Sequence, residues 1–105
     1  ANASVYSASK GALTAVVRSL AVELAERKIR VNGISPGPIT TPIYDKLGMP
    51  KDATAAFQAN MTTKVPLQRF GAAEEVARTA LFLASPAASY VTGAEVPVDG
   101  GVAIS

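Results

Sequence analysis

Tyr6 and Lys10 are the two residues of this sequence whose types and spacing are best suited to chemistry. They stand near the start of a segment with helical periodicity, where residues four apart share a face, so we expect the phenol and the ammonium group to be neighbours. A cation close to a phenol favours the phenolate, which helps the phenol to donate or accept a proton near neutral pH. Taken alone, the pair also fits two amphipathic side chains whose stems cover apolar surface.

Several sequence blocks follow the pair in order and give it a context. They are residues 29–34, 35–42, 66–71 with 74–77, 83–85 and 91–101. In this order, the pair and the blocks resemble the C-terminal half of a short-chain dehydrogenase/reductase, from the NAD(P)-dependent family with a Tyr-x-x-x-Lys active site. The resemblance extends from about residue 4 to residue 101, and several blocks in order are far more specific than one motif.

The resemblance implies catalytic roles for Tyr6 and Lys10. The matching tyrosine, Tyr6, is the general acid in carbonyl reduction and the general base in alcohol oxidation, and the matching lysine, Lys10, hydrogen-bonds the nicotinamide ribose. The expected enzyme is an NAD(P)-dependent oxidoreductase that interconverts a carbonyl and a secondary alcohol by hydride transfer. Its cofactor is NAD or NADP and its substrate is a small carbonyl or alcohol molecule; the sequence narrows neither further.

Residues 36–41 match the family's Pro-Gly-x-Ile-x-Thr loop. Such a loop follows a parallel strand, and open α/β sheets bind ligands beyond the carboxyl ends of their strands. The resemblance implies that Ile39 backbone groups and the Thr41 hydroxyl contact the nicotinamide carboxamide, with Pro36 and Gly37 completing the cofactor-binding loop. The alternative is structural: a turn followed by a helix that Thr41 caps.

Hydrophobic periodicity and the Gly and Pro positions predict the elements that must place these residues. They are a helix over 5–28, a strand over 29–35, short helices over 43–47 and 52–62, a helix over 73–84 and a strand over 95–98. The order is typical of the α/β class, here as the C-terminal half of a Rossmann-like doubly wound parallel sheet. We expect residues 1–105 to form a single partial domain, with 42–63 as a substrate lid.

The periodicity also predicts which side chains point inward. One stripe of the first helix comprises Tyr6, Lys10, Leu13, Val17, Leu20 and Leu24, and a second stripe is rich in alanine. A sheet should cover one stripe, and the other suits close packing against a second subunit. The inward residues of the helix over 73–84 should be Val76, Ala77, Ala80, Leu81, Leu83 and Ala84.

Four charged residues late in the chain are predicted to have structural rather than catalytic roles. Arg69 and Asp99 match recurring family positions, and we assign them to loop anchoring and turn formation. Glu74 and Glu75 are expected to form a solvated first helical turn, where carboxylates are favourable.

Composition excludes several classes of function. Hydrophobic residues make up 49% of the 105 positions and charged residues 17%, which predicts apolar surface buried against further chain or against other subunits of a homo-dimer or homo-tetramer. The absence of cysteine and histidine excludes a Ser-His-Asp triad and thiolate metal sites, and we expect no metal. Scattered basic residues argue against nucleic acid, and the lack of a long apolar run or leader pattern indicates a cytoplasmic, non-membrane protein.

The family's Gly-rich pyrophosphate loop has no counterpart in this sequence. The matched region begins just before the catalytic tyrosine, so we expect this chain alone to be inactive and its chemistry to belong to a complete enzyme. A second hypothesis is a non-catalytic oligomerisation fragment without independent cofactor binding.

Overall fold

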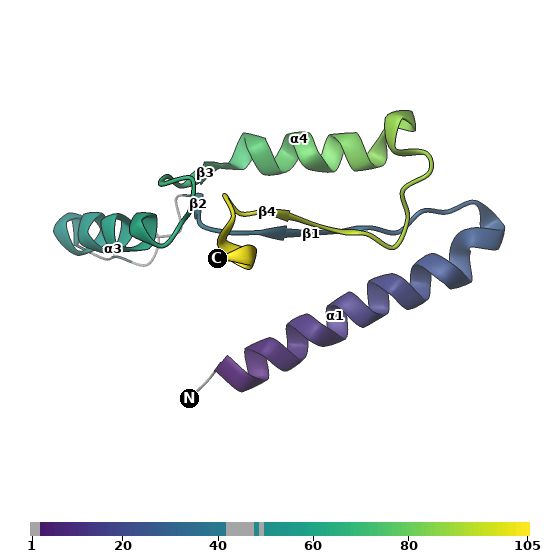
Figure 1. Cartoon of the computed structure of the whole chain (residues 1–105), viewed down its shortest axis with the longest axis horizontal. Helices are drawn as coiled ribbons and strands as arrows, with labels where there is room; N and C mark the ends of the chain where they lie inside the picture. The colour runs from purple at the N-terminus through teal and green to yellow at the C-terminus, as the bar shows by residue number, and fades with distance from the viewer. Residues whose placement is uncertain (1–2, 42–47, 49) are drawn as a thin grey trace. The chain divides into compact units, whose positions relative to one another are not determined.

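The computed structural model describes residues 3–41, 48 and 50–105, and Figure 1 follows the chain through them. The helices are α1 (Ala3–Leu24), α3 (Lys51–Thr63) and α4 (Ala73–Ala84), with short 3₁₀ helices η1 (Ala25–Arg27), η2 (Pro86–Ala88) and η3 (Val102–Ile104). The strands are β1 (Gly33–Pro36), β2 (Ile39–Thr40), β3 (Gly71–Ala72) and β4 (Glu95–Val98). The predicted helix over 43–47 lies outside the described residues.

The strands form two pairs, β1 with β4 and β2 with β3. The second pair is parallel, with Ile39 opposite Gly71. In the first pair, Gly33 N–H donates to Ala94 O and Gly37 N–H donates to Val98 O, so both partners advance together and the strands run parallel. Helix α4 lies between β1 and β4 in the chain, which makes a crossover connection. Parallel strands joined through a helix confirm the predicted α/β class.

The chain divides into two compact units: Ala1–Ile34 with Phe82–Val96, and Ser35–Leu81 with Pro97–Ser105. In the first unit, one face of α1 is covered by the rest of the unit. Its covered residues are Thr14, Val17, Ala21 and Leu24. A Cβ added at Gly33 would lie 3.7 Å from Val17 Cγ2, and one added at Gly93 would lie 3.5 Å from Ala21 Cβ, so both glycines face α1.

Part of the predicted inward stripe of α1 is wrong. Leu13 is 63% exposed and Leu20 is also exposed, whereas Val17 and Leu24 are covered as expected. The small side chain of Ala21 lies at the centre of the contact, so the covered face is turned away from Leu13 and Leu20. In α4 the inward prediction is confirmed for Leu83, which is buried. It is wrong for Leu81, which is 71% exposed, and for the three exposed alanines Ala77, Ala80 and Ala84.

Residues 29–32 precede β1 rather than forming the first half of the predicted strand. Side chains replace a strand ladder here: Asn32 Nδ2 and Arg30 NH1 both donate to Val91 O, at 3.0 and 3.1 Å, and Asn32 Oδ1 accepts from Ala94 N–H. Val31 N–H donates to the Thr92 hydroxyl instead of to a strand carbonyl. The segment is therefore held at a fixed register against residues 91–94.

In the second unit, Val65 is almost fully buried against a turn of the C-terminal segment. Gly100 makes this approach possible: a Cβ there would lie 2.6 Å from Val65 Cγ1, and its φ of +62° is one that L-residues rarely adopt. Leu67 N–H donates to Gly100 O and completes the contact.

Lys28 generates a testable prediction about stability. It caps η1 with φ of 58° and ψ of 34°, a left-handed conformation that glycine adopts without the steric cost of a Cβ. We expect Lys28→Gly to raise the free energy of unfolding by about 0.5–1 kcal/mol in urea denaturation, since relief of strain exceeds the added entropy of the unfolded chain. Arg27→Gly, one residue earlier inside η1, should lower it; the same sign for both variants would contradict the assignment.

Candidate active site

Tyr6 and Lys10 lie one turn apart on α1, as the spacing predicts. Both side chains are exposed, Tyr6 by 69%, and within the described ranges neither makes a hydrogen bond or an ion pair. Thr14, one turn beyond Lys10, is the first residue of α1 that the rest of its unit covers. The phenol and the ammonium group are therefore available to an added ligand.

The predicted cofactor loop begins at the end of β1. Pro36 is the exposed last residue of that strand. Gly37 is pressed against the C-terminal segment, because a Cβ at this position would lie 2.6 Å from Asp99 Cβ and 2.7 Å from Asp99 Cα. The need for glycine here comes from packing against the chain itself.

Ile39 lies in β2 with its main chain oriented by the pairing with β3. Pro38 O accepts from Gly71 N–H at 2.9 Å, and in a parallel pair this pattern directs the N–H and C=O of Ile39 away from β3. Thr41 follows β2 and is exposed. Whether Thr41 caps a helix, as predicted, is a question about residues outside the described ranges.

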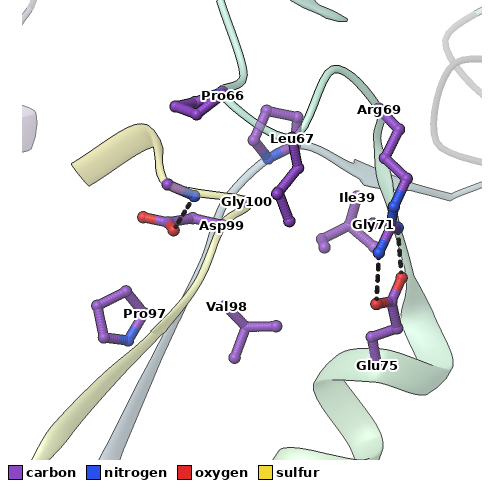
Figure 2. A pocket seen from close by; sticks show the side chains of 12 residues that line it. Ile39, Pro66, Leu67, Arg69, Gly71, Glu75, Pro97, Val98, Asp99 and Gly100 are labelled. Atoms are coloured by element: carbon purple, nitrogen blue, oxygen red, sulfur yellow. Dashed lines mark hydrogen bonds and ion pairs between the residues drawn. The ribbon is translucent and has the colours of Figure 1, made fainter. Parts of the chain in front are cut away.

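The Ile39 side chain lines a pocket of about 470 Å³ that the sequence did not predict (Figure 2). Its walls come from two turns, from residues of β2, β3 and β4, and from the first turn of α4. The lining residues are Pro38, Ile39, Pro66, Leu67, Arg69, Gly71, Glu75 and 97–101. The pocket belongs wholly to the second unit. The sequence marked these segments only as blocks of the family resemblance and, at Asp99, as a turn, and neither predicts a cavity.

Arg69 and Glu75 form a two-pronged ion pair beside this pocket, with N–O distances of 2.8 and 3.0 Å (Figure 2). Arg69 also donates to Phe70 O, which confirms its predicted role as a loop anchor. Glu75 lies in the first turn of α4 and is partly exposed, as predicted, but its carboxylate is paired rather than only solvated. Its carboxylate also accepts from Ala72 N–H, just before α4 begins, so it caps the helix while it holds the loop.

The ion pair changes the protonation of both partners. The Arg69 hydrogen bonds, followed by the bond from Ala72 N–H, lower the pKa of Glu75 from 4.5 to about 2, and the Glu75 hydrogen bond raises the pKa of Arg69. Asp99 makes a turn of its own: its carboxylate accepts from Gly101 N–H and Ala103 N–H, both at 2.9 Å. The predicted turn-forming role of Asp99 is confirmed.

The described residues offer no cluster of three or more acidic, histidine or cysteine side chains that could hold a metal ion. Within the same ranges, every helix is too short or too polar to cross a membrane.

The site can now be compared with known proteins. The family model described as "Enoyl-(Acyl carrier protein) reductase" matches residues 1–103. The 3-oxoacyl-[acyl-carrier-protein] reductase FabG of Thermotoga maritima is 46% identical over 99 residues, which make up 94% of this chain and 38% of that protein.

Solved structures agree with this match. A short-chain type dehydrogenase/reductase from Mycobacterium marinum is 40% identical with a TM-score of 0.81, over 97% of this chain and 37% of that one. YwfH, an NADPH dependent reductase involved in bacilysin biosynthesis, is 37% identical with a TM-score of 0.77, over 90% and 38%. The chain belongs to the short-chain dehydrogenase/reductase family, a family of oxidoreductases, and it spans less than two fifths of the length of these relatives.

The packing of Gly37 predicts a sharp contrast between two glycine-to-alanine substitutions. Gly37→Ala must push the loop away from Asp99, and we expect a loss of about 1–3 kcal/mol in the free energy of unfolding. Gly11, in the middle of α1, has open space where a Cβ would go, so Gly11→Ala should stabilise by up to about 1 kcal/mol through helix propensity. Thermal and urea unfolding measure both, and a tolerated Gly37→Ala would contradict the close approach.

The lowered pKa of Glu75 predicts a pH dependence of stability. Because its pKa is lower in the folded chain than the 4.5 expected when unfolded, Glu75 stabilises the fold above about pH 4.5 and loses this effect as the pH falls towards 2. Urea unfolding should show Glu75→Gln to be less stable than the parent at pH 6, with the difference shrinking below pH 4. Glu74→Gln is the matched control, since Glu74 makes only a looser, exposed contact with Arg78 at 3.5 Å. A constant difference down to pH 2 would refute the argument.

Proposed function

We propose that this chain supplies the proton-transfer pair and a nicotinamide-contacting loop of an NAD(P)-dependent oxidoreductase that interconverts a carbonyl and a secondary alcohol. One observation carries the proposal: in a chain of this family, Tyr6 and Lys10 present an exposed phenol and an exposed ammonium group one turn apart on the same helix. Neither group is engaged elsewhere in the described part of the chain, so both remain free for a ligand.

The two side chains fit different parts of the reaction. The bound nicotinamide would supply or accept the hydride. Tyr6 would donate a proton to the carbonyl oxygen during reduction and accept one from the alcohol during oxidation, through its hydroxyl oxygen. Lys10, with three N–H donors and no acceptor, suits the ribose hydroxyls of the cofactor. Its place one turn from Tyr6 would keep the cofactor and the proton donor together.

The loop after β1 fits a carboxamide as its ligand. A carboxamide has both a donor and an acceptor, and Ile39 turns a main-chain N–H and C=O away from β3. Thr41 adds an exposed hydroxyl two residues on. Pro36 and Gly37 would fix the path of the loop, Gly37 through its contact with Asp99. These features support cofactor binding by Pro36, Gly37, Ile39 and Thr41.

The names of relatives support the reaction class and the type of cofactor. One relative is a 3-oxoacyl-[acyl-carrier-protein] reductase and another is an NADPH dependent reductase. We infer a small carbonyl or alcohol substrate and a nicotinamide cofactor. The residues described here favour neither NAD nor NADP.

We further propose that the 105-residue chain is inactive by itself. It spans 38% of its relative FabG, and its sequence contains no Gly-rich phosphate loop. In dinucleotide sites of this type, such a loop and the helix that follows it hold the pyrophosphate. The catalytic pair would then act only in a complete enzyme.

An oligomerisation role is the second candidate, and a specific observation favours it. Five large aliphatic residues of α1 are exposed: Val5, Leu13, Val16, Leu20 and Val22. Such a patch is typical of a surface that another subunit or further chain covers. This role could accompany catalysis in a homo-dimer or homo-tetramer, or stand alone in a non-catalytic fragment.

Titration of the chain with NADH and NADPH tests the proposal, with nicotinamide fluorescence for binding and sedimentation for mass. We expect no saturable binding by the 105-residue chain. In the complete protein that carries it, Tyr6→Phe should lower kcat by 10²–10⁴-fold, as roughly expected for loss of a general acid, and Lys10→Ala should weaken cofactor binding.

Other results would assign the function differently. Saturable binding by the chain that Lys10→Ala abolishes would overturn the proposed inactivity. Full activity in Tyr6→Phe would exclude the catalytic assignment. A self-associating chain whose complete protein has no nicotinamide-linked activity would establish the oligomerisation role.

A further inference from the structure

A hydrogen bond between Thr14 and Glu95 connects the helix of the proposed catalytic pair to β4. The Thr14 hydroxyl lies 2.6 Å from Glu95 Oε2 and 3.2 Å from Lys10 O, one turn earlier in α1. A hydroxyl has one proton, so it donates to only one of these acceptors at a time. The shorter contact, to a carboxylate, is the stronger kind of hydrogen bond.

This bond lies at a point along α1 from which it can affect the turns that carry Lys10 and Tyr6. Every described residue of α1 before Thr14 is exposed, so Thr14 is the first described residue of the helix that is partly covered. The main chain of β1 and the Glu95 side chain of β4 meet α1 here: a Cβ at Gly33 would lie 3.7 Å from Val17 Cγ2 and 3.8 Å from Glu95 Cγ. Among the described residues, those of the turns that carry Lys10 and Tyr6 are exposed.

We propose that Thr14 and Glu95 are positioning residues, which set the place of Lys10 and Tyr6 by fixing α1 at this point. The inference rests on the proposed function of the Tyr6–Lys10 pair. Eight residues separate Tyr6 from Thr14, or about 12 Å of helix, so a tilt of about 5° at the anchor displaces Tyr6 by about 1 Å. An error of that size in a catalytic group is enough to slow a reaction substantially.

The second hydrogen bond that the Thr14 hydroxyl can make, to Lys10 O, would add to this displacement of the catalytic pair. Without the Glu95 carboxylate, the Thr14 hydroxyl donates to Lys10 O, and such bonds from Ser or Thr to the preceding turn bend helices. The bend would fall in the turn that carries Lys10. Because Glu95 is exposed, the bond contributes little to stability, and its main consequence is geometric.

Nuclear magnetic resonance of the 105-residue chain tests the anchor without reference to activity. In Glu95→Ala, a change at an exposed residue far away in sequence, we expect the amide signals of Tyr6 and Lys10 to shift. Thr79→Val is the matched control, because Thr79 also donates to the carbonyl four residues earlier, Glu75 O, but contacts no second element through its hydroxyl. Unmoved Tyr6 and Lys10 signals in Glu95→Ala would overturn the inference.

Kinetics of the complete protein test the consequence. We expect Thr14→Val to lower kcat by about tenfold with the KM for the carbonyl substrate nearly unchanged, and Thr14→Ser, which keeps the hydroxyl, to restore kcat. Equal kcat values for Thr14→Val and the parent, or a Thr14→Ser variant as slow as Thr14→Val, would refute the positioning role. A parent protein without nicotinamide-linked activity would refute the proposed function instead, and the resonance experiment would still decide whether the anchor exists.

Discussion

Hydrogen bonds between residues 30–32 and residues 91–93, about sixty positions apart in the sequence, hold the first unit together. Val91 O receives hydrogen bonds from Arg30 and Asn32, and Gly93 N–H donates to Val31 O at 2.7 Å. These bonds fix the register in which β1 meets β4, and the register decides where Glu95 stands. Helix α1 lies against one of these segments, since a Cβ at Gly93 would lie 3.5 Å from Ala21 Cβ. A buried backbone group left without a partner is costly, so the side chains of residues 30 and 32 are specified tightly.

The parts of the fold that the sequence predicted are those governed by local rules. Helix α4 has the predicted bounds, Ala73–Ala84, since its periodicity is strong and Pro86 follows it closely. The strand over 95–98 was predicted for similar reasons. The start of β1 was placed too early, because Ile29 and Val31 favour a strand by propensity. Such residues join a strand ladder only if the facing segment accepts their N–H groups through its backbone. Here the Thr92 hydroxyl accepts from Val31 N–H instead.

The same division separates local from long-range features of the candidate site. A four-residue spacing was enough to place Tyr6 and Lys10 one turn apart on a helix. It could not show that Thr14 contacts a residue 81 positions away, nor that Glu75 binds both Arg69 and Ala72. The pocket beside Ile39 depends on a two-residue strand pair, β2 with β3, that is too short to have a periodicity. Contacts of this kind are properties of the assembled chain.

The Thr14–Glu95 contact also orders events during synthesis. Helix α1 leaves the ribosome well before β4, and Glu95 is added 81 residues after its partner Thr14. At about 5–20 residues per second, this interval lasts roughly 4–16 s. The Arg69–Glu75 pair closes over six residues and forms almost at once. The helix of the proposed catalytic pair is therefore made seconds before the residue that anchors it at Thr14 exists.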